Sequence, residues 1–221
     1  MKANRTSMLK RDTSAQVGIG TLIIFIAMVL VAAIAAAVLI QTSGVLQQKA
    51  QATGEEATSE VSSNMKVLAA EGIRDDTTDL SDNIDLLEVQ VSVSAGGSAM
   101  DLEQMVISIS DGDTTNTLTY NDSANLSDSS FRAEEIRDED DSFDNSTNPV
   151  MNKGDLIRLY ISTTNEGDKI IDSQNVSTSN LVLDPRTDVQ LTFTPESGTP
   201  QQMSFVTPSS YGVDKRLSLY P

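Results

Sequence analysis

The sequence predicts an α+β protein in which one long N-terminal apolar helix is followed by an antiparallel, immunoglobulin-like β-sandwich. Two observations support this fold class. The chain of 221 residues begins with a basic leader and a long uncharged apolar segment, and its remainder alternates short apolar runs with turn-forming residues. We therefore divide the chain into a leader at residues 1–15, a helix at residues 16–52 and an outer β domain at residues 53–221.

The apolar segment has the length of a membrane-spanning helix. No residue between Thr13 and Gln48 is charged, and residues 17–40 are apolar except for Thr21, whereas about 20 residues suffice to cross a bilayer. A secretory signal has a shorter apolar core and a small-residue cleavage site after it, but here polar Gln41 follows. We expect the segment to remain on the mature protein, with the basic leader in the cytoplasm and the acidic bulk outside.

Small residues are dense within this helix. They include Ala27, Ala32, Ala33, Ala35, Ala36 and Ala37. Because small side chains let helix backbones approach closely, this composition favours a helix packed among copies of itself over a simple anchor. The residues that we expect in the core of such an assembly are Leu22, Phe25, Ala33, Ala36 and Leu39.

The composition excludes several function classes. The chain has no cysteine and no histidine, so a disulfide framework, thiol chemistry and a histidine-dependent catalytic triad are ruled out. Its net charge of −17 makes nucleic acid an unsuitable partner. We expect no enzymatic activity and no cofactor. The acidity fits either an ordinary solubilising surface or adaptation to high salt, and the scarcity of lysine favours the second.

The outer domain has the period-two pattern of β-strands. Residues 87–93 alternate apolar and polar side chains, and two further apolar runs, at 105–109 and 118–120, flank the turn sequence DGDTTN. Further strands are expected at residues 156–162, 180–183, 189–193 and 203–206. The acidic run at residues 134–144 is expected to be a solvated loop. Neither this run nor DGDTTN has the ligand spacing of an EF-hand, so we predict no metal site.

Two stretches of the sequence carry a family resemblance. The segment GIGTLIIFIAMVLVAAIAAAVL at residues 18–39 and the segment ATGEEATSEVSSNMKV at residues 52–67 resemble the N-terminal region of archaeal flagellins (archaellins), and most of all those of salt-loving archaea. The resemblance implies a structural subunit of the archaellum, the archaeal swimming filament, which polymerises through its N-terminal helix. It also implies an extracellular location after transient insertion in the cytoplasmic membrane.

The resemblance further implies a class III, type IV pilin-like signal peptide. A prepilin-peptidase-like membrane protease would cut between Ala15 and Gln16, and a cut after Gly18 is the alternative. The family pattern has glycine before the cut, preceded by lysine or arginine, whereas this chain has Ser14 and Ala15. The implied partners are copies of the chain itself, other archaellins and a membrane assembly platform.

Four sequons for N-glycosylation lie in the outer domain, at Asn121, Asn125, Asn145 and Asn175. Asn4 also begins a sequon, but it lies in the leader. Because the outer domain is expected to face the exterior, and glycosylated archaellins are known as a class, the four sites are candidates for modification.

Two rival functions share parts of this pattern. An archaeal type IV adhesion pilin would have the same leader and helix, although the GIGTL start favours an archaellin. A membrane-anchored extracellular binding protein would keep its leader and would not need a helix so rich in alanine.

Overall fold

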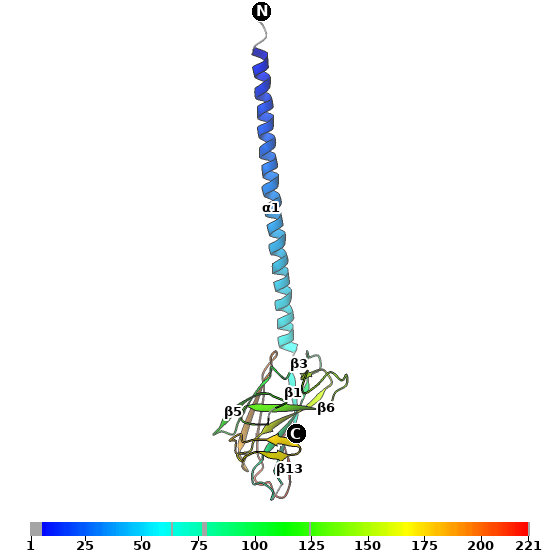
Figure 1. The fold of residues 1–221 in the computed structure, drawn as a ribbon, viewed down its shortest axis with the longest axis vertical. Coiled ribbons are helices and arrows are strands. Elements are labelled where there is room, and N and C mark those ends of the chain that lie inside the picture. Colours follow the sequence, from blue (N-terminus) through cyan, green and yellow to red (C-terminus); the bar gives the residue numbers. More distant parts are fainter. Residues whose placement is uncertain (1–5, 63, 77–78, 124, 221) are drawn as a thin grey trace, which may run out of the picture. The chain divides into compact units, whose positions relative to one another are not determined.

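The computed structural model describes residues 6–62, 64–76, 79–123 and 125–220. The chain divides into two compact units, Met1–Glu55 and Glu56–Pro221. Helix α1 (Thr6–Ser62) is unbroken (Figure 1) and continues beyond residue 52, where the sequence predicted its end. No proline interrupts it. At its C-terminal end the side-chain amide of Asn64 donates to the carbonyl oxygen of Val61 (3.3 Å), which satisfies one of the carbonyls that a helix end leaves unpaired.

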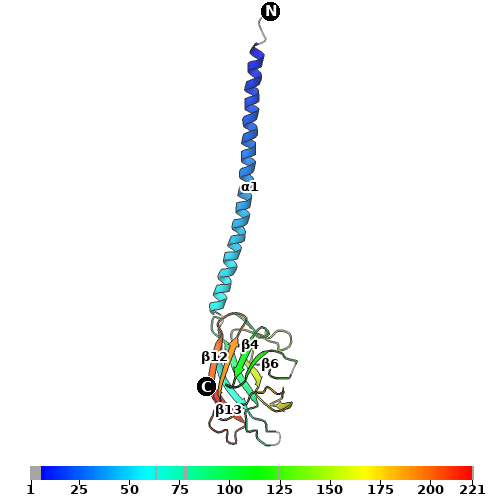
Figure 2. The ribbon, with the colours of Figure 1, turned by 90° about the vertical axis from the view of Figure 1, so that its left-hand side faces the viewer.

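The outer domain is built around one long sheet. Among the described residues nine strands form it, in the order β12-β11-β4-β5-β6-β8-β2-β1-β13. Their bounds are β1 (Met65–Ile73), β2 (Leu86–Val93), β4 (Val106–Ser110), β5 (Thr115–Tyr120), β6 (Ser130–Arg137), β8 (Leu156–Ser162), β11 (Asp188–Thr194), β12 (Gln201–Val206) and β13 (Arg216–Tyr220). Figure 2 shows β11 and β12, in orange, beside the green β4.

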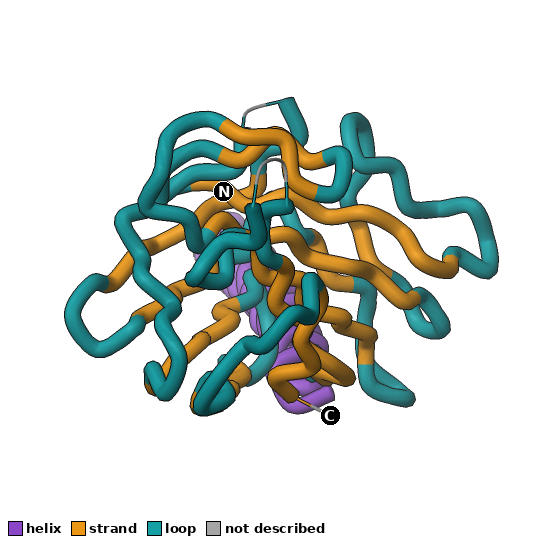
Figure 3. Tube along the Cα trace, turned by 90° about the horizontal axis from the view of Figure 1, so that it is seen from below, coloured by secondary structure: helices purple, strands orange, loops and turns teal. Residues whose placement is uncertain are grey.

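Most neighbouring strands of this sheet are antiparallel, and β5 and β6 pair in parallel. The end strands β12 and β13 lie close to each other, so the sheet curls around a common interior. Two short pairs complete the domain, β3 (Met100–Asp101) with β7 (Val150–Met151) and β9 (Lys169–Ile171) with β10 (Gln174–Val176). Figure 3 traces these strands and their connecting loops. The predicted α+β fold class is confirmed, because a long apolar helix precedes a mostly antiparallel β domain. Except at residues 180–183, the strands predicted to form an immunoglobulin-like sandwich lie in one curled sheet of nine strands among the described residues.

Strand β2 contributes to apolar clusters on both faces of the sheet. Leu87 belongs to the main core, whereas its neighbour Leu86 belongs to a smaller cluster on the opposite face. That smaller cluster consists of Ile73, Leu86, Leu126, Tyr160, Ile171 and Val176. Successive side chains of a strand point to opposite faces, so β9, β10 and the segment around Leu126 cover the outer face of the sheet at this point.

The predicted hairpin around DGDTTN is confirmed, because β4 and β5 pair antiparallel across this turn. The strands predicted at residues 87–93, 156–162, 189–193 and 203–206 correspond to β2, β8, β11 and β12.

The strand predicted at residues 180–183 is wrong. Asn180 has a φ angle of 58°, which is incompatible with an extended strand, and only Leu183 forms an isolated bridge, with Ile84. Leu181 and Leu183 are nevertheless fully buried. The apolar alternation therefore indicated burial correctly but not ladder pairing.

The loop predicted at residues 134–144 is wrong in its first part. Glu134, Glu135, Ile136 and Arg137 form the exposed end of β6, and only the residues after Arg137 form a turn. Because these side chains face solvent, their sequence shows no buried alternation. No strand was predicted at the positions of β1, β3, β6, β7, β9, β10 and β13.

Candidate functional site

The most exposed apolar surface of the described chain lies on α1. Every described side chain between Gln16 and Ile40 is exposed, including Leu22 (58%), Phe25 (64%) and Leu39 (68%). Ala33 and Ala36 are exposed as well. The predicted core residues of the helix are thus all available for contacts outside this chain. By length and composition, the helix is also able to cross a membrane.

The apolar side chains occur on all sides of α1 and not along one stripe. A helix of this kind is stable only where its surroundings are apolar on every side. The small side chains of Ala33 and Ala37 lie in a shallow apolar groove, which is also lined by Phe25, Ile26, Val29, Leu30 and Ile34. Such a groove can accept a ridge of side chains from another helix.

Two threonine hydroxyls of this helix already have hydrogen-bond partners within it. The hydroxyl of Thr21 donates to the carbonyl oxygen of Gly18 (2.9 Å), and the hydroxyl of Thr42 donates to that of Leu39 (3.0 Å). Because both hydroxyl protons are used within the helix, burial of α1 leaves neither of them without a partner.

The predicted cleavage bond between Ala15 and Gln16 lies inside α1, and the side chain of Gln16 is exposed. The four candidate sequons lie at the surface of the β domain. Asn121, Asn125 and Asn175 are exposed, and Asn145 is half-buried. The hydroxyl of Tyr120 donates to the backbone carbonyl of Asn145 (2.5 Å), and burial of this phenol raises its pKa.

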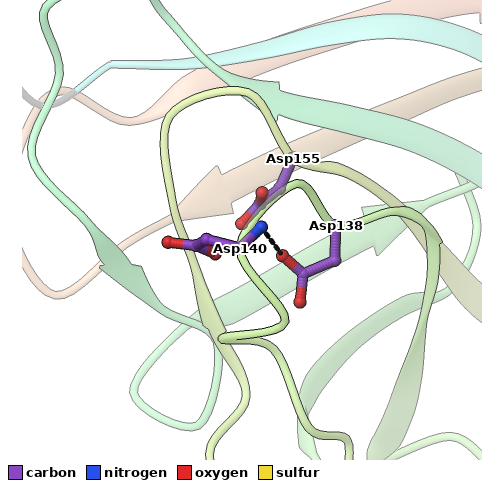
Figure 4. A group of neighbouring side chains, drawn as sticks. All are labelled: Asp138, Asp140 and Asp155. Atoms are coloured by element: carbon purple, nitrogen blue, oxygen red, sulfur yellow. Dashed lines mark hydrogen bonds between the residues drawn. The ribbon is translucent and has the colours of Figure 1, made fainter.

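Three carboxylates gather at the turn that follows β6. Asp138, Asp140 and Asp155 each place a carboxylate oxygen within 4.8 Å of the others (Figure 4). Asp138 accepts hydrogen bonds from the backbone N–H groups of Asp140 (3.1 Å) and Phe143 (2.8 Å). These bonds, that from Phe143 above all, lower the pKa of Asp138 and keep its carboxylate ionised.

Asp155 is the buried member of this acidic cluster. It is 1% exposed, and its Oδ2 accepts the N–H of Asn152 (2.7 Å). Its Oδ1 is buried and has no hydrogen-bond partner among the described residues. A buried carboxylate oxygen without a donor is costly, and an oxygen-binding cation is a suitable partner for it, since hard divalent cations prefer carboxylate oxygens.

Sequence reasoning found only part of this cluster. Asp138 and Asp140 lie in the acidic run for which the sequence predicts no metal site, because the run lacks the ligand spacing of an EF-hand. The third carboxylate comes from Asp155, just before β8, and β8 pairs with β6. Because the pairing of β6 with β8 joins segments that are apart in the sequence, the spacing of residues does not indicate that Asp155 belongs to the cluster.

Comparisons with known proteins agree with these features. A family model described as archaeal-type flagellin matches residues 15–205. Flagellin B2 of Methanocaldococcus jannaschii is 42% identical over 212 residues, covering 88% of this chain and 89% of that protein.

Two solved structures share the fold. The crystal structure of an archaeal flagellin from Methanocaldococcus jannaschii covers 72% of this chain and 97% of its own, at a TM-score of 0.58 and 23% identity. The archaeal flagellum of Methanospirillum hungatei covers 92% of this chain and 99% of its own, at a TM-score of 0.63 and 16% identity. The chain belongs to the archaeal-type flagellin family and is a structural, non-enzymatic subunit of the extracellular archaellum filament.

Proposed function

We propose that the mature protein begins at Gln16 and polymerises through α1, with Leu22, Phe25, Ala33, Ala36 and Leu39 buried against α1 of other copies. The observation that carries this proposal is the exposure of the entire apolar surface of α1. Full burial of one large apolar side chain is worth about 1.5–3 kcal/mol, so this helix strongly favours lipid or other helices over water.

Removal of the leader would allow the helix to leave the membrane. The leader carries Lys2, Arg5, Lys10 and Arg11, which hold the N-terminus at the cytoplasmic face. Once a prepilin-peptidase-like protease has removed these charges, a bundle of identical helices is an apolar alternative to lipid. A membrane assembly platform would transfer the subunit from one environment to the other. A helical polymer needs a head-to-tail contact that does not close on itself, and α1 supplies it.

Mass spectrometry of filaments sheared from cells tests this proposal. We expect a chain that begins at Gln16. A chain that begins at Ile19 would move the cut but preserve the mechanism. A chain that starts near Thr42 would show loss of the apolar segment and contradict polymerisation through α1, and a chain that retains Met1 would favour a membrane-anchored binding protein. Recovery only from adhesive, non-swimming filaments would favour a type IV pilin.

We also propose that the protein is adapted to high salt, in the manner of haloarchaeal archaellins, and that it is N-glycosylated at some of Asn121, Asn125, Asn145 and Asn175. The net charge of −17 supports the first proposal. The surface position of the sequons supports the second.

A specific observation favours a second role for the outer domain, the binding of a divalent cation by Asp138, Asp140 and Asp155. The unpartnered Oδ1 of Asp155 carries this proposal. The cation would join the turn after β6 to the turn before β8 and neutralise three neighbouring negative charges.

A further inference from the structure

Two of the sequons lie side by side in the structure although 50 residues separate them in the sequence. Leu126 and Val176 form a parallel bridge. The N–H of Leu126 donates to the carbonyl of Asn175 (2.9 Å), and the N–H of Ser177 donates to the carbonyl of Leu126 (2.7 Å). The sequon that begins at Asn125 and the sequon that begins at Asn175 are therefore neighbouring extended segments.

The direction of the side chains places both asparagines on the same face. Leu126 and Val176 are fully buried in the smaller apolar cluster. Because side chains alternate along an extended segment, Asn125 and Asn175, which each precede one of these buried residues, point outward together. Both are exposed. Neighbouring extended segments are about 4.8 Å apart, so the two asparagines occupy adjacent positions on one surface.

The side chains of the two sequons are also in direct contact. The amide Nδ2 of Asn125 donates to the hydroxyl of Ser177 (3.3 Å), and this hydroxyl donates to Asp168 (2.6 Å). Ser177 is the hydroxyl residue of the sequon that begins at Asn175. The two acceptor motifs thus share one hydrogen-bonded surface, which we call the paired-sequon patch and define as Asn125, Ser127, Asn175 and Ser177.

We propose that the paired-sequon patch accepts only one glycan at a time, on either Asn125 or Asn175. This inference rests on the proposed N-glycosylation of the outer domain. A glycan is bulky and needs open solvent around its attachment point. A glycan on either asparagine would fill the solvent space next to the other asparagine and next to Ser177. A glycosyltransferase could then not reach the amide of the second asparagine.

The experiment uses the full chain, produced in its archaeal host with Ser123→Ala and Thr147→Ala. These changes remove the sequons of Asn121 and Asn145 and keep both asparagine side chains. Intact-mass spectrometry then counts the glycans on the paired-sequon patch alone, and glycopeptide analysis locates them. We expect molecules with one glycan, some on Asn125 and others on Asn175, and no molecule with two.

Two further variants of this background test the exclusion. With Asn125→Gln, the occupancy of Asn175 should rise to the sum of the two occupancies measured before, and Asn175→Gln should do the same for Asn125. As a matched control, Thr147→Ala alone in the parent sequence should leave the glycan occupancy of Asn125 and Asn175 unchanged. Molecules with two glycans, or an occupancy that does not respond to loss of the other sequon, would overturn the exclusion but not glycosylation itself. Absence of glycan from all four sequons of the unmodified chain would overturn both.

Discussion

The carboxylate of Asp111 is hydrogen-bonded to the backbone of Val182, which is distant in the sequence: its Oδ2 accepts the Val182 N–H at 3.1 Å. Its Oδ1 accepts the N–H groups of Asp113 (3.0 Å) and Thr114 (2.6 Å) inside the β4–β5 turn. One side chain thus shapes the hairpin turn and holds the segment that follows Asn180, whose ladder pairing in the described chain is limited to the isolated bridge between Leu183 and Ile84.

Replacement Asp111→Asn tests this role. An amide cannot accept the Val182 N–H through its NH₂ group, so at neutral pH we expect a loss of about 1–2 kcal/mol in the free energy of unfolding. Asp113→Asn is the matched control, because it removes the same charge from the same turn but not the contact with Val182. Chemical denaturation measures both. Equal effects of the two substitutions would contradict the role of Asp111.

The pH dependence of this effect has a defined sign. Burial alone would raise the pKa of Asp111, but hydrogen bonds from Thr114, Val182 and Asp113 outweigh it and lower the pKa below the ordinary value of 3.8. A carboxyl group with a lowered pKa stabilises the fold above the unfolded pKa, and that contribution is lost as the pH falls through the folded value. The difference between the parent protein and Asp111→Asn should therefore shrink below pH 3.8.

The acidic cluster predicts stabilisation by calcium. Added Ca²⁺ should raise the melting temperature of the protein, and a free concentration 100 times the dissociation constant corresponds to about 2.7 kcal/mol. Asp155→Asn should remove most of this increase. Asp141→Asn is the control, since it lies in the same acidic run outside the cluster. If calcium stabilised all three proteins equally, the effect would be general charge screening and not binding at Asp155.

A charge in the apolar groove of α1 should abolish assembly. Ala33→Asp places a carboxylate where burial offers neither water nor a counter-ion, so we expect cells without filaments. The outer domain should still fold, as judged by circular dichroism of the purified protein. Ser98→Asp adds the same charge at an exposed position of the β domain and should leave filaments intact. Normal filaments and swimming with Ala33→Asp would place the assembly contact elsewhere.

The acidity of the outer domain predicts a strong dependence of stability on salt. Residues 53–221 hold 10 of the 15 basic and 31 of the 32 acidic residues, a net charge of 10 − 31 = −21. Compaction brings these charges together, and salt screens their repulsion. The melting temperature of this fragment should rise steeply with potassium chloride, and the rise should continue toward molar concentrations, where salting-out of apolar groups contributes. A melting temperature that does not change with salt would refute adaptation to high salt.

Local patterns in the sequence were sufficient for the helix and for several strands. An uninterrupted apolar run without charge or proline can satisfy its backbone and its side chains in one way, as a helix in apolar surroundings, and α1 follows. The alternation at residues 87–93 and the turn residues of DGDTTN likewise have a direct structural meaning, and β2, β4 and β5 confirm them.

The same patterns did not predict two segments correctly. In one, every side chain of a strand end faces solvent; in the other, side chains are buried although the backbone is not part of a strand ladder. The outward-facing end of β6 has no buried alternation, and Asn180 turns the chain so that Leu181 and Leu183 are buried without a ladder. A local pattern reports which side chains are buried. It does not report which backbone pairs with which.

By itself, the sequence determined the long apolar helix near the N-terminus, because an uncharged apolar run behind a basic segment is a property of consecutive residues. Only the tertiary structure brings Asp155 close to Asp138 and Asn125 close to Asn175. The pairing of β6 with β8 places the two aspartates together, and the bridge between Leu126 and Val176 places the two asparagines together. Both depend on contacts between distant segments, which form only when the sheet buries its two apolar faces.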